Sequence, residues 1–262
     1  AIKGYTLILL ARDSEKSRDA LKEIRDKSDS ENIDMIFTDL SSLDSLEKTV
    51  QSIKNSYNRL DGIINNAGVY KRNFEKSPEG LEMPLTVNYL APIYLTRMLL
   101  PLLEQSSPAR IINVTSGLYK NGKTDFESFN PEGKFNGLQA YADTKLLLNY
   151  FTYYLADVLQ DKNITANAVH PGVVATHVFR ELPAFINKIL QLLVRKPSKG
   201  AKPVIYAASS PELEGVTGKY FDKMKIFPAL QSVYNENDAR QILEKTENII
   251  NREMPGISDY KL

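Results

Sequence analysis

Short apolar runs rich in β-branched residues alternate along this chain with longer segments of helical periodicity. Six runs have the length and composition of strands: 5–10, 33–38, 62–65, 110–115, 164–169 and 217–221. Between the second and third runs, apolar residues recur at spacings of three and four, which places them on one helix face. They are Leu43, Leu46, Val50, Ile53 and Tyr57. A repeated strand–helix order predicts parallel βαβ units, and so an α/β fold with a doubly wound, Rossmann-like parallel sheet.

The composition limits the chain to a few protein classes. Its 262 residues are 42% apolar, which is enough for one large core, so we expect a single domain over residues 1–262. With 33 basic and 32 acidic residues, the net charge of +1 provides no field that would attract nucleic acid. Cysteine is absent and the only histidines are His170 and His177, so we expect neither disulfides nor a metal site.

The same composition bears on location. A chain without cysteine fits a reducing compartment, and we expect the cytoplasm or the cytosolic face of a membrane. The apolar segment 93–103 is interrupted by Arg97 and Pro101, so we expect no membrane span in this chain. Because Ala1 stands only a few residues before the first run, we expect the sheet to lack its first strand. We predict a strand and a Gly-rich turn just upstream, about 25 residues in all.

Ligands of doubly wound sheets bind beyond the carboxyl ends of the strands, so the residues after each run are functional candidates. Ala11 and Arg12 follow the first run. In a dinucleotide site an acidic residue here holds the adenosine ribose, whereas an arginine pairs with a 2′-phosphate. Arg12 therefore favours NADP(H), with NAD the less favoured cofactor. The alternative is a solvated arginine beside a helix cap formed by Asp13 or Ser14.

The next two strand ends carry polar and small residues. Asp39, followed by Leu40, is placed to receive an adenine amino group, although capping of the following helix is the simpler interpretation. The third run is followed by Asn66, Ala67 and Gly68. Small residues let a backbone approach a flat ligand closely. The alternative there is an ordinary tight turn.

Taken in order, the motifs of this chain resemble those of the short-chain dehydrogenase/reductase family over nearly its whole length. Segment 60–69 contains the Asn-Asn-Ala-Gly motif, and Asn88 matches the active-site asparagine of the family. Strand 110–115 leads into Ser116, which matches the family's serine. Segment 170–176 matches the part that lies against the nicotinamide.

The family's Tyr-x-x-x-Lys motif occurs twice in this sequence. Tyr119 and Lys123 enclose an Asn-Gly turn signal, so they are not expected to share a helix face. Tyr141 and Lys145 open the helical pattern that we predict for residues 143–159, and residues four apart on a helix project the same way. The second pair is therefore the one that resembles the family's catalytic tyrosine and lysine.

The resemblance implies a set of site residues. The catalytic residues would be Asn88, Ser116, Tyr141 and Lys145. Contacts to NADP(H) would come from Arg12, Asp39, Leu40, Asn66, Ala67, Gly68, Tyr141, Lys145, Pro171, Gly172, Val173 and Thr176. The reaction implied is the interconversion of a carbonyl and an alcohol in a single dinucleotide-binding and catalytic domain.

The expected mechanism depends on the acidity of a phenol. A free tyrosine, with a pKa near ~10, is a reluctant proton donor and acceptor at neutral pH. We expect the ammonium of Lys145, helped by an oxidised nicotinamide, to lower the pKa of Tyr141. Ser116 would donate to the carbonyl oxygen as charge develops there. By resemblance, Lys145 would also hold the nicotinamide ribose, and Asn88 the water through which Lys145 is resupplied with protons.

The separation of 25 positions between Ser116 and Tyr141 resembles the branch of the family that includes retinol dehydrogenases. Residues 178–208 would contain a substrate lid, and its apolar composition suggests a lipophilic substrate. The alternative for that segment is a helix that packs on a partner subunit of a homo-oligomer. Residues 235–254 are expected to form a C-terminal helix. The alternative function is a catalytically silent NADP(H)-binding sensor or interaction module.

Overall fold

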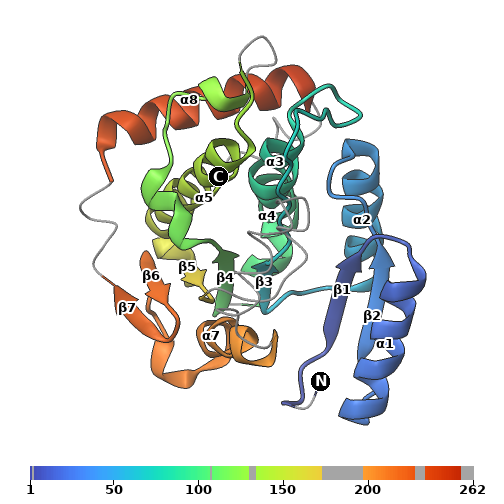
Figure 1. Cartoon of the computed structure of the whole chain (residues 1–262). Coiled ribbons are helices and arrows are strands. Elements are labelled where there is room, and N and C mark those ends of the chain that lie inside the picture. The colour runs from blue at the N-terminus through green and yellow to red at the C-terminus, as the bar shows by residue number, and fades with distance from the viewer. Residues whose placement is uncertain (2, 107, 130–133, 173–196, 228–233, 255–262) are drawn as a thin grey trace.

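The computed structural model describes residues 1, 3–106, 108–129, 134–172, 197–227 and 234–254. Its strands form two sheets (Figure 1). The first contains β1 (Leu7–Ala11) and β2 (Ile33–Phe37), which are parallel. The second contains, in spatial order, β3 (Gly62–Asn65), β4 (Ala109–Val114), β5 (Ile164–His170), β6 (Lys219–Asp222) and β7 (Lys225–Phe227). Only β7 is antiparallel to its neighbour among these described strands.

Helices cover both faces of the larger sheet, as expected for a doubly wound α/β domain. The helices are α1 (Glu15–Ser28), α2 (Leu43–Ser56), α3 (Met83–Leu85), α4 (Ala91–Glu104), α5 (Gly137–Val158), α7 (Pro197–Ser209) and α8 (Glu236–Glu253). α4 and α5 lie on one face, α7 lies on the other, and α8 crosses the outer side of α4 and α5 (Figure 1). The predicted fold class and the single domain are confirmed.

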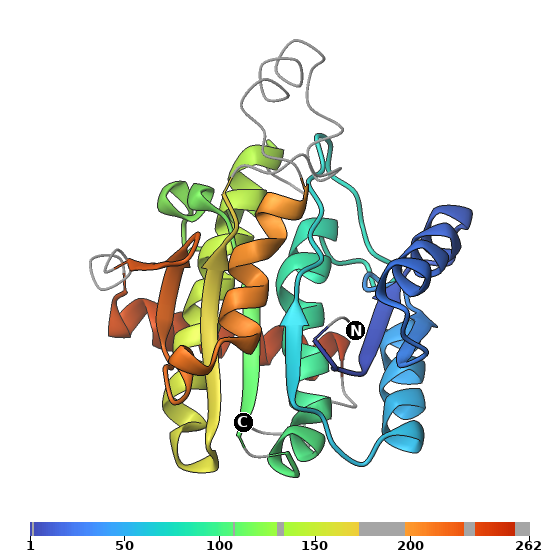
Figure 2. The same ribbon diagram turned by 90° about the horizontal axis from the view of Figure 1, so that it is seen from below.

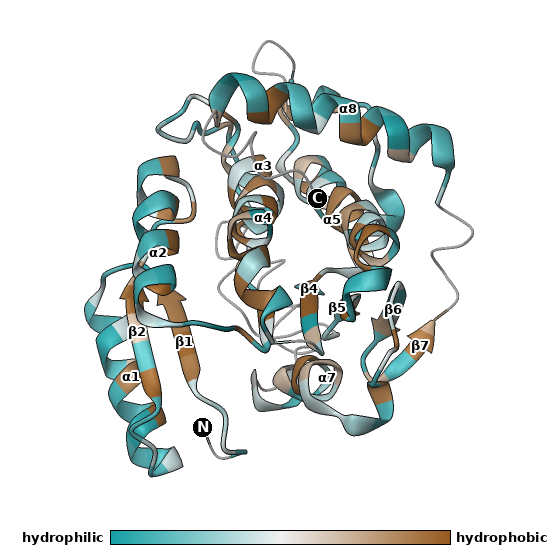
Figure 3. Cartoon of the chain, turned by 180° about the vertical axis from the view of Figure 1, so that it is seen from behind, coloured by the Kyte–Doolittle hydropathy of each residue, from teal (hydrophilic) through white to brown (hydrophobic). Residues whose placement is uncertain are grey.

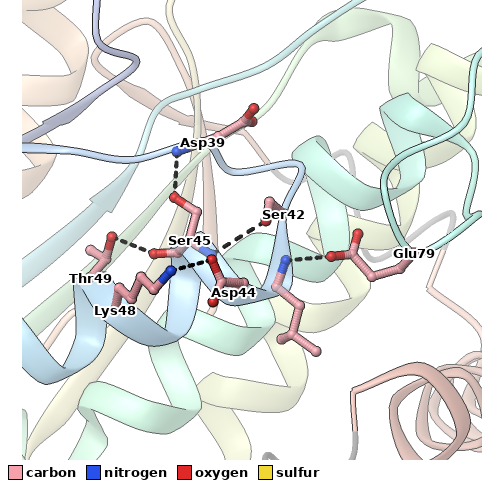
Figure 4. Close-up of polar contacts among 8 residues, drawn as sticks. Asp39, Ser42, Asp44, Ser45, Lys48, Thr49 and Glu79 are labelled. Atoms are coloured by element: carbon pink, nitrogen blue, oxygen red, sulfur yellow. Dashed lines mark hydrogen bonds and ion pairs between the residues drawn. The ribbon is translucent and has the colours of Figure 1, made fainter.

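The helix predicted after Asp39 forms as α2 because its apolar stripe is buried. Leu46, Val50 and Ile53 are at most 3% exposed, and each such burial contributes about 1.5–3 kcal/mol. Ser42 caps the helix, since its hydroxyl accepts the N–H of Ser45 at 3.3 Å (Figure 4). The predicted stripe and the observed helix agree in register.

The fourth layer, α8, is fixed to α4 by polar as well as apolar contacts. Arg97, which is only 4% exposed, pairs with Glu247 of α8. The hydroxyls of Tyr89 and Thr246 are 2.9 Å apart, and Ile250 of α8 is fully buried. The outer face of α8 is mainly hydrophilic, with its apolar residues turned inward (Figure 3). The helix predicted for residues 235–254 thus packs on the back of the site-bearing helices.

The structure differs from the predictions at the start of α5 and in one additional strand. Helix α5 begins at Gly137 rather than near residue 143, because Asn136 caps it by accepting the N–H groups of Leu138 and Gln139. Strand β7 was not predicted. It has three residues, all exposed, and follows β6 through a two-residue turn.

The two sheets present open edges towards one another in the described part of the chain. β1 pairs only with β2, and β3 pairs only with β4 (Figure 2). A parallel strand between β1 and β3 would use both edges, so the strand and Gly-rich turn expected upstream stay a prediction. No helix among the described residues combines the length and the apolar character that crossing a bilayer requires.

Candidate active site

β1 to β6 run in the same direction within their sheets. The candidate residues that follow these strands therefore lie on the carboxyl-end side of the sheets. Helix α5 brings Tyr141 and Lys145 to this edge one turn apart. Both are buried, with exposures of 6% and 3%. The Lys145 Nζ atom lies 5.7 Å from the centre of the Tyr141 ring. The two residues therefore share a helix face, as the sequence predicted.

Lys145 is held against the end of β4. Its Nζ donates to the carbonyl oxygen of Val114 at 3.0 Å, which is the one acceptor that the described residues offer it. The hydroxyl of Thr115 donates to the carbonyl of Lys145 at 3.3 Å. Burial lowers the pKa of Lys145 to about 8, because a buried ammonium loses its hydration. The site thus contains a cation that has spare donors and few protein partners.

Burial also dominates the acidity of Tyr141. It raises the pKa of the phenol to about 12, and a hydrogen bond with Ser116 acts in the opposite direction. The lowering is therefore due to Ser116, and the lowering that we expected from Lys145 is not among the causes of the shift. The raised pKa favours the neutral phenol, which is the form that can donate a proton.

Ser116 sits where β4 ends and a 3₁₀-helix (Gly117–Asn121) begins. Its hydroxyl caps that helix by accepting the N–H of Leu118 at 3.3 Å. His170, at the end of β5, backs the same turn, since a Cβ added to Gly117 would lie 3.5 Å from its Nε2. Burial lowers the pKa of His170, which favours the neutral imidazole. The serine is therefore enclosed by α5 on one side and by β5 on the other.

Asn88 lies in a π-helical turn (Thr86–Leu90) between α3 and α4 and is fully buried. Its Oδ1 accepts the N–H of Val69 at 2.7 Å, and its Nδ2 donates to the Val69 carbonyl at 2.9 Å. The Nδ2 also donates to the Thr144 hydroxyl at 3.1 Å. Because both N–H groups are used, the side chain holds the segment after β3 in place and has no donor left for a water.

The segment after β3 approaches Lys145 closely. A Cβ added to Gly68 would lie 3.4 Å from the Lys145 Nζ and 3.5 Å from the Asn88 Oδ1. Asn66 and Ala67 are exposed beyond the strand end. The predicted cofactor contacts of this segment therefore border Lys145 and Asn88.

After β5, Pro171 and Gly172 are half-buried, and Gly172 has a φ of 86°, a conformation that favours glycine. They follow directly on His170. Val173 and Thr176 lie outside the described residues. The structure thus places only the first part of the predicted nicotinamide segment at the edge of the sheet.

The predicted contacts to the adenosine end lie on the smaller sheet. Arg12 is exposed directly after β1, and the described residues give it no hydrogen bond or ion pair. Asp39 organises the start of α2: its N–H donates to the Ser45 hydroxyl at 2.8 Å (Figure 4). Its Oδ1 accepts the Ser41 N–H at 2.9 Å. Leu40 is half-buried. The capping alternative for Asp39 is therefore present in the structure, while its carboxylate group points away from the axis of α2 (Figure 4).

The other predicted features fall partly outside the described chain. Residues 178–196 of the expected lid lie there, and residues 197–208 belong to α7, which packs on β4 and β5. The other Tyr-x-x-x-Lys pair is separated by the end of the 3₁₀-helix, with Tyr119 inside that helix and Lys123 beyond Gly122. That pair shares no helix face.

Sequence reasoning missed residues that connect the site. Thr144 receives the Asn88 amide and donates to the Tyr141 carbonyl at 2.8 Å, so it joins the π-turn to α5. Thr115 and Val114 anchor Lys145 through backbone and hydroxyl contacts. Thr144 could have been found from its helical spacing of three from Tyr141. The contact with the Val114 carbonyl oxygen could not have been found in this way, because a backbone acceptor does not depend on the type of side chain.

A model of the short chain dehydrogenase family matches residues 1–187. The chain belongs to this family. Human retinol dehydrogenase 13 is 34% identical over 100% of this chain and 82% of its own length. Human polyprenol dehydrogenase is 32% identical over 99% of this chain and 80% of its own. Human retinol dehydrogenase 14 is 38% identical over 81% of this chain, and the match spans only 65% of that protein. Membership in the retinol dehydrogenase-like branch is thereby confirmed.

Solved structures agree with the fold. A short chain dehydrogenase from Escherichia coli CFT073, complexed with NADPH, is 25% identical with a TM-score of 0.67, covering 84% of this chain and 86% of that one. A protein from Mycobacterium paratuberculosis has a TM-score of 0.72 at 20% identity, covering 98% and 86% of the two chains. The chain is thus an oxidoreductase of the family that uses a nicotinamide cofactor and acts on alcohols or carbonyls.

The residues present fit such a cofactor. Lys145 is a fully buried ammonium with one protein acceptor among the described residues, so sugar hydroxyls can take its remaining N–H groups. Gly68 leaves the backbone open beside it. A cationic donor set with room next to it is what a ribose of the cofactor requires.

Proposed function

We propose that this protein is an NADP(H)-dependent oxidoreductase that interconverts a carbonyl and an alcohol on a lipophilic substrate, with Tyr141 as general acid and base. The observation that carries the proposal is that Tyr141, Ser116 and Lys145 lie together at the carboxyl end of β4. Tyr141 hydrogen-bonds Ser116, and the Lys145 Nζ lies 5.7 Å from its ring. Three such groups together can exchange a proton with an oxygen atom and stabilise charge on it.

The bound cofactor supplies or accepts the hydride. The residues that would hold it are Lys145 at the nicotinamide ribose, the backbone at Gly68, and Arg12 at a 2′-phosphate. Arg12 supports NADP(H) because it is an exposed guanidinium directly beyond β1 to which the described residues give no partner, whereas an acidic residue there would suit the hydroxyls of NAD. Asp39 would accept the adenine amino group through the oxygen that it does not use at α2.

The chain's own groups then divide the work at the reacting oxygen. Tyr141, held neutral by burial, donates its proton during reduction, and Ser116 donates a hydrogen bond to the same oxygen. Lys145 stabilises the phenolate that remains, because the buried ammonium lies on the same helix face. Asn88 keeps the segment 66–69 fixed, so that the site does not open behind Lys145.

The substrate class is inferred from the relatives and from composition. Retinol dehydrogenases 13 and 14 and polyprenol dehydrogenase carry names of isoprenoid alcohols. The apolar segment 178–196 follows the nicotinamide motif in sequence. We propose an isoprenoid, steroid-like or similar lipophilic alcohol or carbonyl as the substrate.

A direct test is to mix the purified protein with NADPH and a panel of retinal, polyprenal and simple ketones, and to follow NADPH absorbance. Turnover that Tyr141→Phe abolishes supports the proposal. NADPH binding without oxidation by any substrate would contradict it and would favour a silent NADP(H)-binding sensor.

A further inference from the structure

The chain segment that follows Ser116 is pressed against α5. A Cβ added to Gly122 would lie 2.7 Å from the Leu146 Cβ and 2.8 Å from the Ala142 carbonyl oxygen. Side-chain carbons are not found at such distances, so only glycine fits there. Its φ of −72° is ordinary, which means that close approach and not backbone conformation requires the glycine. Segment 117–123 is thus seated on the helix that carries the catalytic tyrosine and lysine.

Two polar side chains of α5 fasten this segment. The Asp143 Oδ1 accepts the N–H of Lys123 at 2.6 Å and the Nε2 of Gln139 at 2.7 Å. The same Gln139 Nε2 donates to the Asn121 carbonyl at 2.9 Å. The turn at 121–123 is therefore held at two backbone positions by a carboxylate and an amide that also bind each other.

The helix presents the clamp and the chemistry on opposite faces. Gln139 and Asp143 are four residues apart and share one face, and Tyr141 and Lys145, also four apart, share another. Successive helical residues turn by about 100°, so Asp143 projects about 200° from Tyr141. One rigid element thus determines where Tyr141 lies and where the segment after Ser116 lies.

The surroundings of Asp143 are unfavourable for a charged carboxylate. Asp143 is 1% exposed, and burial raises the pKa of its carboxyl group. A buried carboxyl group is unfavourable unless it is hydrogen-bonded, and the Oδ1 atom of Asp143 is bonded to the Lys123 N–H and to Gln139. The purpose that the contacts indicate is the fixed placement of segment 117–123.

We propose that Asp143 and Gln139 are positioning residues that clamp the segment after Ser116 onto α5 and so set the placement of the Ser116 hydroxyl relative to Tyr141. Its catalytic consequence rests on the proposed function above. Displacement of a reacting group by about 1 Å can cost ~100-fold in rate, so a loosened clamp lowers turnover without removing any catalytic group.

Gln139→Leu is the informative variant, because Gln139 is half-buried and its loss removes two hydrogen bonds without opening the core. We expect kcat to fall about tenfold, with an unchanged KM for NADPH. Asp143→Leu should have a larger effect, and Asp143→Asn, which keeps an acceptor oxygen, should restore most of the rate. Gln160→Leu, an exposed glutamine in the 3₁₀-helix (Gln160–Lys162) that follows α5, is the matched control with wild-type kcat.

A second measurement does not depend on turnover. Amide hydrogen exchange at Lys123 should be faster in Asp143→Leu and Gln139→Leu than in the wild type, and slow again in Asp143→Asn. Slow exchange at Lys123 in both leucine variants would overturn the clamp. So would a wild-type kcat in a folded Gln139→Leu protein. If the wild type turns over no substrate, the proposed function fails, while the exchange experiment still decides whether the clamp exists.

Discussion

The five-stranded sheet and the two-stranded sheet differ sharply in how deeply their strands are buried. In the larger sheet Ile111, Ile112 and Val169 are fully buried between α5 and α7. In the smaller one every residue of β1 is only half-buried, although the strand is hydrophobic along its length (Figure 3), and α1 buries none of its residues. The groups proposed for chemistry gather at the carboxyl ends of the larger sheet, whereas those proposed for adenosine recognition follow the strands of the smaller one.

This division matches the demands of the two tasks. Proton transfer requires atoms fixed within fractions of an ångström, which a densely packed sheet provides. Recognition of a phosphate by an exposed arginine tolerates more motion, because charge attracts at longer range. The open edges of β1 and β3 lie between the two sheets. The densely packed five-stranded sheet therefore ends at β3, and the residues proposed for adenosine recognition begin beyond that edge.

The largest effect is expected from Tyr141→Phe, which changes only the region built on the five-stranded sheet. Loss of a general acid lowers kcat by about 10²–10⁴-fold, while the Kd for NADPH stays the same because the ring and Lys145 remain. Steady-state kinetics and a fluorescence titration with NADPH measure the two quantities. Near-normal turnover would remove Tyr141 from the mechanism.

Matched isoleucine truncations compare the two regions directly. Ile111→Ala in β4 should lower the free energy of unfolding by about 2–5 kcal/mol, since it leaves a cavity in a closed core. Ile8→Ala in β1 removes a half-buried side chain and should cost about 1 kcal/mol. Urea unfolding monitored by circular dichroism gives both values. Equal losses would mean that the two sheets are equally well packed.

Lys145 should destabilise the ligand-free protein in a pH-dependent way. Its pKa is about 8 in the folded protein and about 10.5 when unfolded, so the folded state binds fewer protons between these values. Stability therefore rises with pH through that window, by about 3 kcal/mol for this residue. Lys145→Met should be more stable than the wild type at pH 7, and the difference should shrink towards pH 10.5. If the difference in stability between Lys145→Met and the wild type did not change with pH, burial would not lower the pKa of Lys145 as described.

Arg12→Ala tests the recognition region and should have the smallest effect. We expect a rise of about tenfold in the Kd for NADPH, or ~1.4 kcal/mol, and almost none in the Kd for NADH. Calorimetric titration with both cofactors measures the difference. Arg18→Ala on α1 is the control, because Arg18 already pairs with Asp13. If both cofactors lose affinity equally, Arg12 does not read the 2′-phosphate.

The elements of this fold that could be predicted from the sequence are those with strong local patterns. The α2 stripe and the strand that leads into Ser116 agree with the structure because each is set by spacing and burial along one element. β7 escaped prediction because three exposed residues have no periodicity. The start of α5 was placed too late because the cap at Asn136 was not recognised.

The candidate site divides in a similar way. The pairing of Tyr141 with Lys145 follows from helical spacing, so the sequence was sufficient. The high pKa of Tyr141 was not predicted, because burial depends on which elements pack around the helix. The contact of Asn88 with Val69 was not predicted either, since backbone partners leave no mark in the sequence.

The π-helical turn at Thr86–Leu90 has a consequence for how this site can change by insertion and deletion. Such a turn carries one more residue than an α-helical turn, and one residue corresponds to about 100° of rotation. Here Asn88 faces Val69 while the adjacent Tyr89 reaches Thr246 on α8. Deleting one residue in this turn would rotate everything before it against α4. The asparagine and the C-terminal helix could then not both keep their partners, so the length of this turn is as constrained as its composition.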